Sequence, residues 1–265
     1  MDNPENLQVL FLASEADPLI KVGGLGDVAG SLPAALRKLS VNPANSGSNA
    51  AIKKERQVDV RLVIPFHGAI RGSQNNLPLV ASYSVPHQDG PIPASIYEMK
   101  LGELPVYLVS GPPIPEDAPV YSGNNDIDGY KYYFFSLAAL ELPKALGWQP
   151  HILHANDWHT ALAIYALSLV RPKDAFYTRT AALLEIHNLP YLGNGAGKQL
   201  VEFGFSPASG SILPWWAQDL PLPLGLLAAD HIVTVSPTYA REILTPEFGS
   251  GLQDFLILRK DSISG

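Results

Sequence analysis

Glycines gather in one short segment that also carries a lysine and an aspartate, Lys21-Val22-Gly23-Gly24-Leu25-Gly26-Asp27. Glycine lets the backbone approach a ligand closely, and the amides that open a helix point their N–H groups toward an anion. Together with the ammonium group of Lys21, these donors could hold a diphosphate. A tight strand-to-helix turn without any ligand is the alternative explanation for the same glycines.

Two other phosphate-binding motifs resemble parts of the sequence but lack an essential residue. The spacing of Gly24, Gly26 and Gly30 is close to a dinucleotide fingerprint, which expects an acidic residue at the end of the second strand. That strand ends in Val63-Ile64-Pro65-Phe66 and offers no carboxylate. A P-loop around Gly197-Lys198 fails because Leu192 replaces its first glycine and Gln199 its serine or threonine.

Histidines stand in two segments that each follow a predicted strand, His154-Ala155-Asn156-Asp157-Trp158-His159 and Ile186-His187-Asn188-Leu189-Pro190-Tyr191-Leu192-Gly193. A metal site built from His151, His154 and His159 is not expected, because residues 151 and 154 point to opposite faces of a strand and the chain has no cysteine. The structural alternatives are that Asp157 caps the next helix, that Trp158 packs in the core, and that His187 is a satisfied structural histidine.

The elements that must position these residues alternate along the chain. Short β-branched runs predict strands at Leu7–Ala13, Val58–Ile64, Leu104–Ser110, His151–His154, Ala181–His187 and His231–Ser236. Helical patterns lie between them, at Leu25–Leu39, Tyr130–Leu146, Thr160–Val170 and Pro237–Leu244. This alternation predicts an α/β fold with a Rossmann-like parallel sheet and helices on both faces. Ligands of such sheets bind at the carboxyl ends of the strands.

Several segments between or within these elements carry separate predictions. Asn42–Asn49 and the charged run Lys53-Lys54-Glu55-Arg56 are expected to form a mobile surface insertion. Ile114–Asp128 is predicted to be a long loop. The run from Tyr132 to Phe135 is expected to supply core and cleft wall. Ser236 is a predicted N-cap before Pro237, with Tyr239 on the cleft side.

Composition excludes some classes of protein. A net charge of −7 argues against a broad basic surface for nucleic acid. No stretch approaches the ~20 apolar residues of a membrane span, and the N-terminal apolar run is too short for a signal peptide. With 46% hydrophobic residues and no cysteine, the chain is expected to be a soluble, cytoplasmic α/β protein.

The longest motif resembles a known family. Glu15-x-x-Pro18-x-x-Lys21-x-Gly23-Gly24-Leu25-x-Asp27-Val28, followed by Leu32-Pro33, is similar to the opening of bacterial glycogen synthases and plant starch synthases. The resemblance runs from Val9 to Gly265. It implies the N-terminal lobe of a glycosyltransferase B (GT-B) fold. It also implies retaining transfer of glucose from ADP-glucose to the 4-hydroxyl of an α-1,4-glucan in glycogen or starch biosynthesis, without a metal or other cofactor.

The resemblance also implies roles for individual residues. His187, Lys21 and Asp27 are the expected catalytic residues. The expected substrate-binding residues are Glu15, Gly23, Gly24, Leu25, Tyr121, Asp128, Asp157, Trp158, His159, Asn188 and Tyr191. The chain departs from the family pattern at Asn156, where Asp or His is common, at Leu192, where Gln is usual, and at Gly129 and Tyr132.

The resemblance further predicts that residues 1–265 form one catalytic lobe and that the C-terminal nucleotide-binding lobe is absent. In the family that second lobe supplies further cations for the diphosphate, so the chain alone is expected to be inactive. The expected partners are a sugar nucleotide, an α-glucan and a C-terminal lobe. A non-catalytic glucan- or nucleotide-binding module and a relative of sucrose synthase are the alternatives. The choice between ADP- and UDP-glucose is left open.

Overall fold

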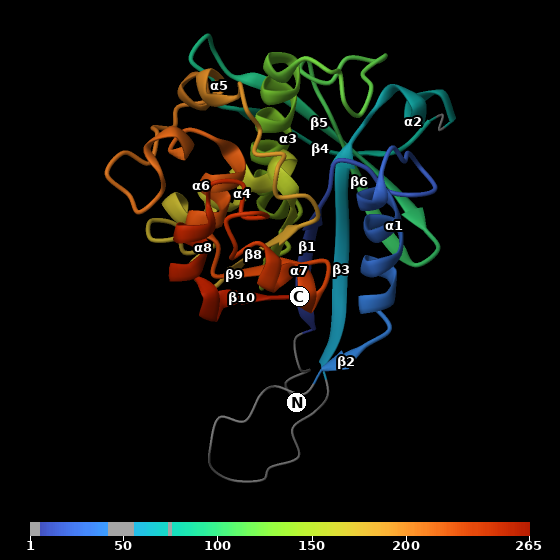
Figure 1. Cartoon of the computed structure of the whole chain (residues 1–265). Helices are drawn as coiled ribbons and strands as arrows, with labels where there is room; N and C mark the ends of the chain where they lie inside the picture. The colour runs from blue at the N-terminus through green and yellow to red at the C-terminus, as the bar shows by residue number, and fades with distance from the viewer. Residues whose placement is uncertain (1–5, 42–55, 74–75) are drawn as a thin grey trace.

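One ten-stranded sheet runs through the part of the chain that the structure describes, residues 6–41, 56–73 and 76–265 of the computed structural model (Figure 1). Its strands follow the order β10-β9-β8-β7-β1-β3-β6-β5-β4, with β2 attached to β3. The strands are β1 (Leu7–Leu12), β2 (Ser40–Val41), β3 (Arg56–Pro65), β4 (Leu79–Val85), β5 (Ile92–Leu101), β6 (Leu104–Ser110), β7 (Ile152–Asn156), β8 (Ala181–Ile186), β9 (His231–Thr234) and β10 (Ile263–Ser264). The predicted insertion at 42–49 and all of the charged run except Arg56 lie outside the described residues.

The parallel part of the sheet confirms the prediction of a Rossmann-like core. Each of the six predicted strands is present, and β1, at its centre, pairs in parallel with β3 and β7. Pairing continues in parallel from β7 through β8 to β9, and from β3 to β6. The carboxyl ends of β1, β7 and β8 therefore meet at one edge of the sheet.

The antiparallel end of the sheet was not predicted. The strands β4 and β5 form a hairpin, and β5 also pairs antiparallel with β6. Polar residues alternate with apolar ones along both strands, and the burial of β5 alternates in the same way. A strand that buries only one face has no continuous apolar run, which was the signal used for the other strands.

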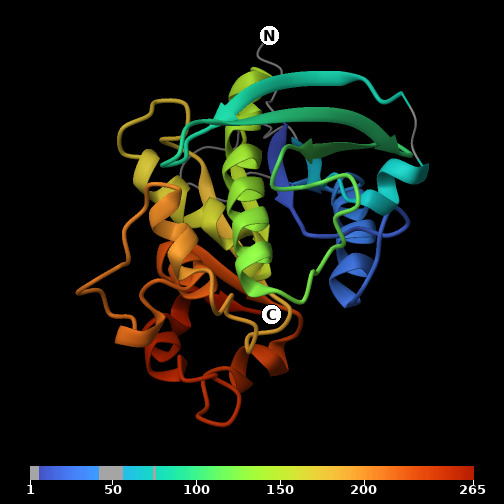
Figure 2. The same ribbon diagram turned by 90° about the horizontal axis from the view of Figure 1, so that it is seen from above.

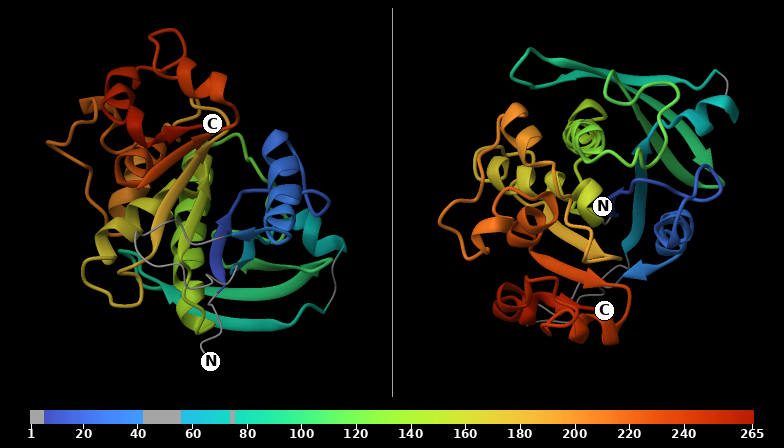
Figure 3. Two further views of the ribbon diagram at one scale, coloured as in Figure 1. Left: turned by 90° about the horizontal axis from the view of Figure 1, so that it is seen from below. Right: turned by 45° about the horizontal axis from the view of Figure 1, so that its top comes forward.

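Helices cover both faces of the sheet, as predicted. They are α1 (Gly24–Leu36), α2 (Gly68–Ser73), α3 (Asn125–Ala145), α4 (Asp157–Val170), α5 (Gly197–Glu202), α6 (Pro221–Ala228), α7 (Pro237–Glu242) and α8 (Gln253–Leu258), with 3₁₀ turns at Trp215–Ala217 and Lys260–Ser262. Within β1, Leu10 and Leu12 join the core cluster under α3 and α4, whereas the alternate residues Val9 and Phe11 join the cluster under α1. Figures 2 and 3 show α1 and α3 on opposite sides of β1.

The predicted helices α1, α4 and α7 are present with ends shifted by up to three residues, whereas α2, α5, α6 and α8 were not predicted. The helix α3 begins at Asn125 rather than Tyr130, because the Asn124 side chain accepts hydrogen bonds from the amides of Asp126 and Ile127. The predicted loop at 114–128 is shorter for the same reason. The helix α6 was not predicted because prolines occupy its first and third positions, where a helix tolerates a missing amide hydrogen.

The remaining local predictions have mixed outcomes. Ser236 caps α7 by accepting a hydrogen bond from the Tyr239 amide at 3.0 Å, as predicted. The aromatic run from Tyr132 to Phe135 is fully buried, so it is core and not cleft wall. Among the described residues, no helix is both long enough and apolar enough to cross a membrane.

Replacing Gly30 with alanine is expected to destabilise the fold by about 1 to 3 kcal/mol. A Cβ atom at Gly30 would lie 2.3 Å from the carbonyl oxygen of Asp17, so α1 and the loop after β1 would have to separate. Urea denaturation measures the effect. The control is Gly72→Ala, because a Cβ atom at Gly72 meets nothing within 4 Å. Both substitutions replace a glycine within a helix, so both gain the same helix propensity from alanine. Equal stabilities of the two variants would contradict the prediction.

Candidate functional site

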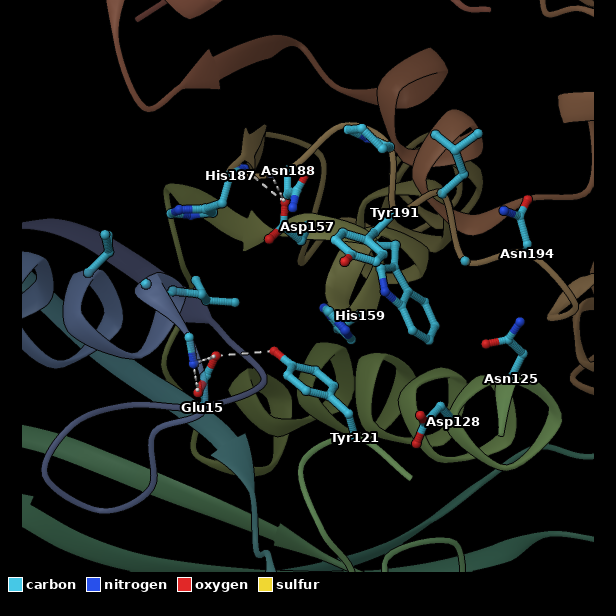
Figure 4. Close-up of a pocket in the computed structure, with 18 of the residues that line it drawn as sticks. Glu15, Tyr121, Asn125, Asp128, Asp157, His159, His187, Asn188, Tyr191 and Asn194 are labelled. Atoms are coloured by element: carbon cyan, nitrogen blue, oxygen red, sulfur yellow. Dashed lines mark hydrogen bonds between the residues drawn. The ribbon is translucent and has the colours of Figure 1, made fainter. Parts of the chain in front are cut away.

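A cavity of about 780 Å³ opens at the carboxyl ends of β1, β7 and β8 (Figure 4). This is the edge at which the sequence predicted a ligand. All predicted site residues except Lys21 and Asp27 line it. They are Glu15, Gly23, Gly24, Leu25, Tyr121, Asp128, Asp157, Trp158, His159, His187, Asn188 and Tyr191.

The carboxylate of Glu15 occupies part of the glycine loop. Glu15 is 1% exposed, and its oxygens accept hydrogen bonds from the amides of Val22 and Gly23, the latter at 3.2 and 3.3 Å. The Gly23 amide is one of those that the sequence suggested for a diphosphate. The next two residues, Gly24 and Leu25, open α1 and line the cavity, and the first amides of a helix have no partner within it.

Lys21 lies in the same loop, and Asp27 lies in the first turn of α1 that follows it. Their side chains form an ion pair of 2.6 Å, and both are well exposed. The hydrogen bond to Asp27 raises the pKa of Lys21, so the lysine is charged at neutral pH. The structure therefore pairs these two predicted catalytic residues with each other and does not place them among the residues that line the cavity.

Tyr121 joins the opposite wall of the cavity to the glycine loop. Its hydroxyl group donates to Glu15 Oε1 at 3.1 Å and lies 3.2 Å from Ser14 Oγ. Figure 4 shows this contact between Tyr121 and Glu15 across the floor of the cavity. Burial raises the pKa of Tyr121, so the phenol keeps its proton.

A buried ion pair fixes the loop that carries Tyr121. Lys131 is 2% exposed, and its Nζ lies 2.8 Å from Asp128 Oδ1 while donating to the carbonyls of Pro119 and Val120 at 3.0 and 2.7 Å. Asp128 also accepts a hydrogen bond from the amide of Ser122. Burial lowers the pKa of Lys131, and Asp128 opposes that shift. Lys131 had no place in the sequence analysis, although a lysine beside a run of aromatic residues is a signal for a buried pair.

One alternative was that Asp157 caps α4, and the structure does not support it: Asp157 is the first residue of the helix, and in the described part of the chain its side chain makes no capping hydrogen bond. Its Oδ1 accepts hydrogen bonds from the amides of His187 at 2.8 Å and Asn188 at 3.3 Å, so the carboxylate fixes the loop after β8. Its backbone has φ of 54°, a left-handed conformation that aspartate tolerates better than most residues. Burial raises the pKa of Asp157, and the hydrogen bonds from these two amides oppose the rise.

His159 lies within an aromatic cluster below the cavity. Its ring centroid is 4.3 Å from that of Trp158, 4.6 Å from Tyr132 and 5.0 Å from Tyr121. Burial lowers its pKa well below the ordinary value, so the imidazole is neutral. Trp158 both packs on the core and lines the cavity, which satisfies the structural and the functional explanation together.

Two asparagines that the sequence analysis did not select also face the cavity. Asn125 is the first residue of α3, and Asn194 lies in the loop after Tyr191; Figure 4 shows both side chains at the same rim. Neither belongs to a motif that sequence spacing identifies. Within the described ranges, no group of three His, Asp or Glu side chains is arranged to hold a metal ion.

The charges of the cavity favour a neutral ligand rich in hydroxyl groups. Glu15, Asp128 and Asp157 contribute carboxyl groups, while none of the described residues that line the cavity is lysine or arginine. Carboxylates accept hydrogen bonds from hydroxyl groups, and aromatic rings offer apolar faces to a ligand. An unaccompanied diphosphate would find no countercharge among these residues.

Comparisons with known proteins agree with the motif. A family model described as "Starch synthase catalytic domain" matches residues 8–42 and 47–258. The chain is 31% identical over 271 residues to the glycogen synthase of Geotalea daltonii, and 35% identical over 269 residues to that of an Anaeromyxobacter strain. Each alignment covers 98% of this chain and 51% of the relative, so the chain spans about half the length of the curated relatives it matches.

A solved structure shows the same fold. The catalytic domain of starch synthase IV from Arabidopsis thaliana, bound to ADP and acarbose, superimposes with a TM-score of 0.78 at 24% sequence identity. The match covers 98% of this chain and 51% of that one. The sheet and its helices are therefore those of one lobe of a GT-B glycosyltransferase.

Proposed function

The chain belongs to the starch and glycogen synthase family, and on this premise we propose that it acts as the N-terminal catalytic lobe in glucan synthesis. The reaction is retaining transfer of glucose from ADP-glucose to the 4-hydroxyl of an α-1,4-glucan. The observation that carries the proposal is the cavity at the carboxyl ends of β1, β7 and β8, where His187 and Asn188 lie beside carboxylates and aromatic rings.

In the proposed reaction the cavity holds the sugars. His187 and Asn188 contact the donor glucose, and Asp157 fixes their backbone through its hydrogen bonds to both amides. Glu15, Asp128, Tyr121, Trp158 and Tyr191 surround the glucan.

Charge develops on the departing diphosphate, and fixed donors stabilise it in the transition state. This lobe offers the amides of Gly24 and Leu25 and, once released from Asp27, the ammonium group of Lys21. We propose that a second lobe supplies the remaining cations, that no cofactor is needed, and that the protein works in the cytoplasm.

A second candidate is a glucan-binding module without catalysis. The absence of lysine and arginine from the described lining of the cavity favours it, because neutral glucan needs no countercharge. The two candidates differ in whether transfer occurs once a second lobe is present.

Joining the chain to the second lobe of the Geotalea daltonii glycogen synthase is expected to give glucan formation from ADP-glucose, whereas the chain alone binds maltoheptaose without transfer. His187→Ala in the chimera is expected to lower kcat/KM about 100-fold, the loss typical of one group that acts on the transition state. Radiolabel transfer from ADP-glucose measures activity, and calorimetry measures maltoheptaose binding.

The matched control is His231→Ala, since His231 lies on β9 and does not line the cavity. A folded chimera that binds maltoheptaose but transfers no glucose would favour the binding module. Failure of the chain to bind maltoheptaose would overturn both candidates.

A further inference from the structure

Asn156 and Glu185 lie side by side behind His187. They are direct partners in the parallel register of β7 and β8, and they are 0% and 6% exposed. Glu185 took no part in the sequence analysis, and Asn156 entered it only as a departure from the family pattern. Both side chains reach the imidazole ring of His187, which follows β8 directly.

The surroundings of one ring nitrogen decide where His187 carries its proton. Nε2 lies 2.9 Å from Asn156 Oδ1 and 3.7 Å from Glu185 Oε1. The orientation of the Asn156 amide is fixed, because its Nδ2 donates at 2.8 Å to the carbonyl of Leu12, which can only accept. Nε2 therefore faces two acceptors and must carry a hydrogen.

The second oxygen of Glu185 is held just as firmly. Nε2 of His154 donates to Glu185 Oε2 at 2.9 Å, and the His154 ring packs against Phe11 with 4.4 Å between centroids. Burial alone would raise the pKa of Glu185, but the hydrogen bond from His154 outweighs this effect and leaves the pKa below its ordinary value. Glu185 is thus a carboxylate at neutral pH and cannot donate a proton to His187.

We propose that Asn156 and Glu185 are positioning residues that keep the proton of His187 on Nε2 and leave Nδ1 as an acceptor for a hydroxyl group of the ligand. The backbone amide of His187 is held at the same time by Asp157, so the residue is fixed at both its main chain and its ring. Among the described residues nothing hydrogen-bonds Nδ1. That the hydroxyl group belongs to a donor sugar rests on the proposed function, whereas the position of the proton does not.

Nitrogen-15 NMR of the histidine-labelled chain tests the proposal without any ligand. His187 is expected to show a protonated Nε2 whose hydrogen exchanges slowly with water, and an unprotonated Nδ1; the signals are assigned by their loss in His187→Gln. In the double variant Asn156→Ala/Glu185→Ala the slowly exchanging signal is expected to disappear, because Nε2 loses both of its acceptors.

The control is Glu247→Gln, which removes an exposed carboxylate remote from the cavity and should leave the His187 signals unchanged. A proton on Nδ1 in the unsubstituted chain would overturn the proposal even if the double variant failed to fold. An unchanged signal in a folded double variant would overturn it as well. Neither outcome depends on whether the protein transfers glucose.

Discussion

Replacing Lys131 with methionine is expected to lower the free energy of unfolding by about 3 to 5 kcal/mol, the cost of leaving one partner of a buried ion pair uncompensated. Asp128 would lose its counter-ion in a site where it is 5% exposed. The carbonyls of Pro119 and Val120 would lose their donor at the same time, so the loop that carries Tyr121 would loosen. Urea denaturation followed by circular dichroism measures the change.

Lys198→Met is the matched control, because the Lys198 side chain is 77% exposed and pairs with Glu202 at 3.2 Å on the surface. Its effect should stay below about 1 kcal/mol. Adding Asp128→Asn to Lys131→Met should recover part of the loss, since the amide removes the stranded charge and can still accept from Ser122. A loss below about 1 kcal/mol for Lys131→Met would show that the pair does not hold the loop.

Lowering the pH from 6.5 to 4 is expected to remove about 3 kcal/mol of stability through His67 alone. Burial, with a smaller contribution from the charge of Lys131, lowers the pKa of His67 from 6.5 to about 4, although its hydrogen bond to the Ser14 carbonyl opposes the shift. Between these values the unfolded chain binds a proton that the folded chain does not, so stability falls as the pH falls. One pKa unit corresponds to about 1.4 kcal/mol, which gives the size of the loss.

The measurement is the free energy of unfolding of the chain and of His67→Gln at several pH values. Glutamine can still donate to the Ser14 carbonyl but does not titrate, so the curve of the variant should be flatter between pH 6.5 and 4. His231→Gln, at a less buried position, should follow the original curve. Parallel curves for the chain and His67→Gln would contradict the prediction.

The parallel core of the fold could be predicted from sequence because most of its strands contain a continuous apolar run. β6 was predicted with its observed bounds, and the ends of β1 and β8 differ by one residue. The hairpin of β4 and β5 and the proline-rich α6 were missed. The strands of the hairpin bury only one face, and the structure of α6 depends on tertiary packing. Neither feature leaves a continuous local pattern in the sequence.

The cavity could be predicted as a set of residues but not as a set of contacts. Motifs after β1, β7 and β8 brought Glu15, Asp157 and His187 to one edge, because parallel strands end together. The partners of the site residues, such as Lys131 for Asp128 or Glu185 for His187, are set by turns and by strand register, which the spacing of residues in the sequence does not encode. Lys21 was assigned to the site from its motif, but its ion pair with Asp27 follows from the local course of the loop.

The carboxylate of Glu15 has a thermodynamic consequence for any ligand that reaches the glycine loop. Loops rich in glycine lose much conformational entropy when they become ordered. Here the chain supplies its own anion to the amides of Val22 and Gly23, so this ordering accompanies folding. A ligand that approaches Gly24 and Leu25 meets a preorganised surface, and its affinity is not reduced by the cost of ordering the loop.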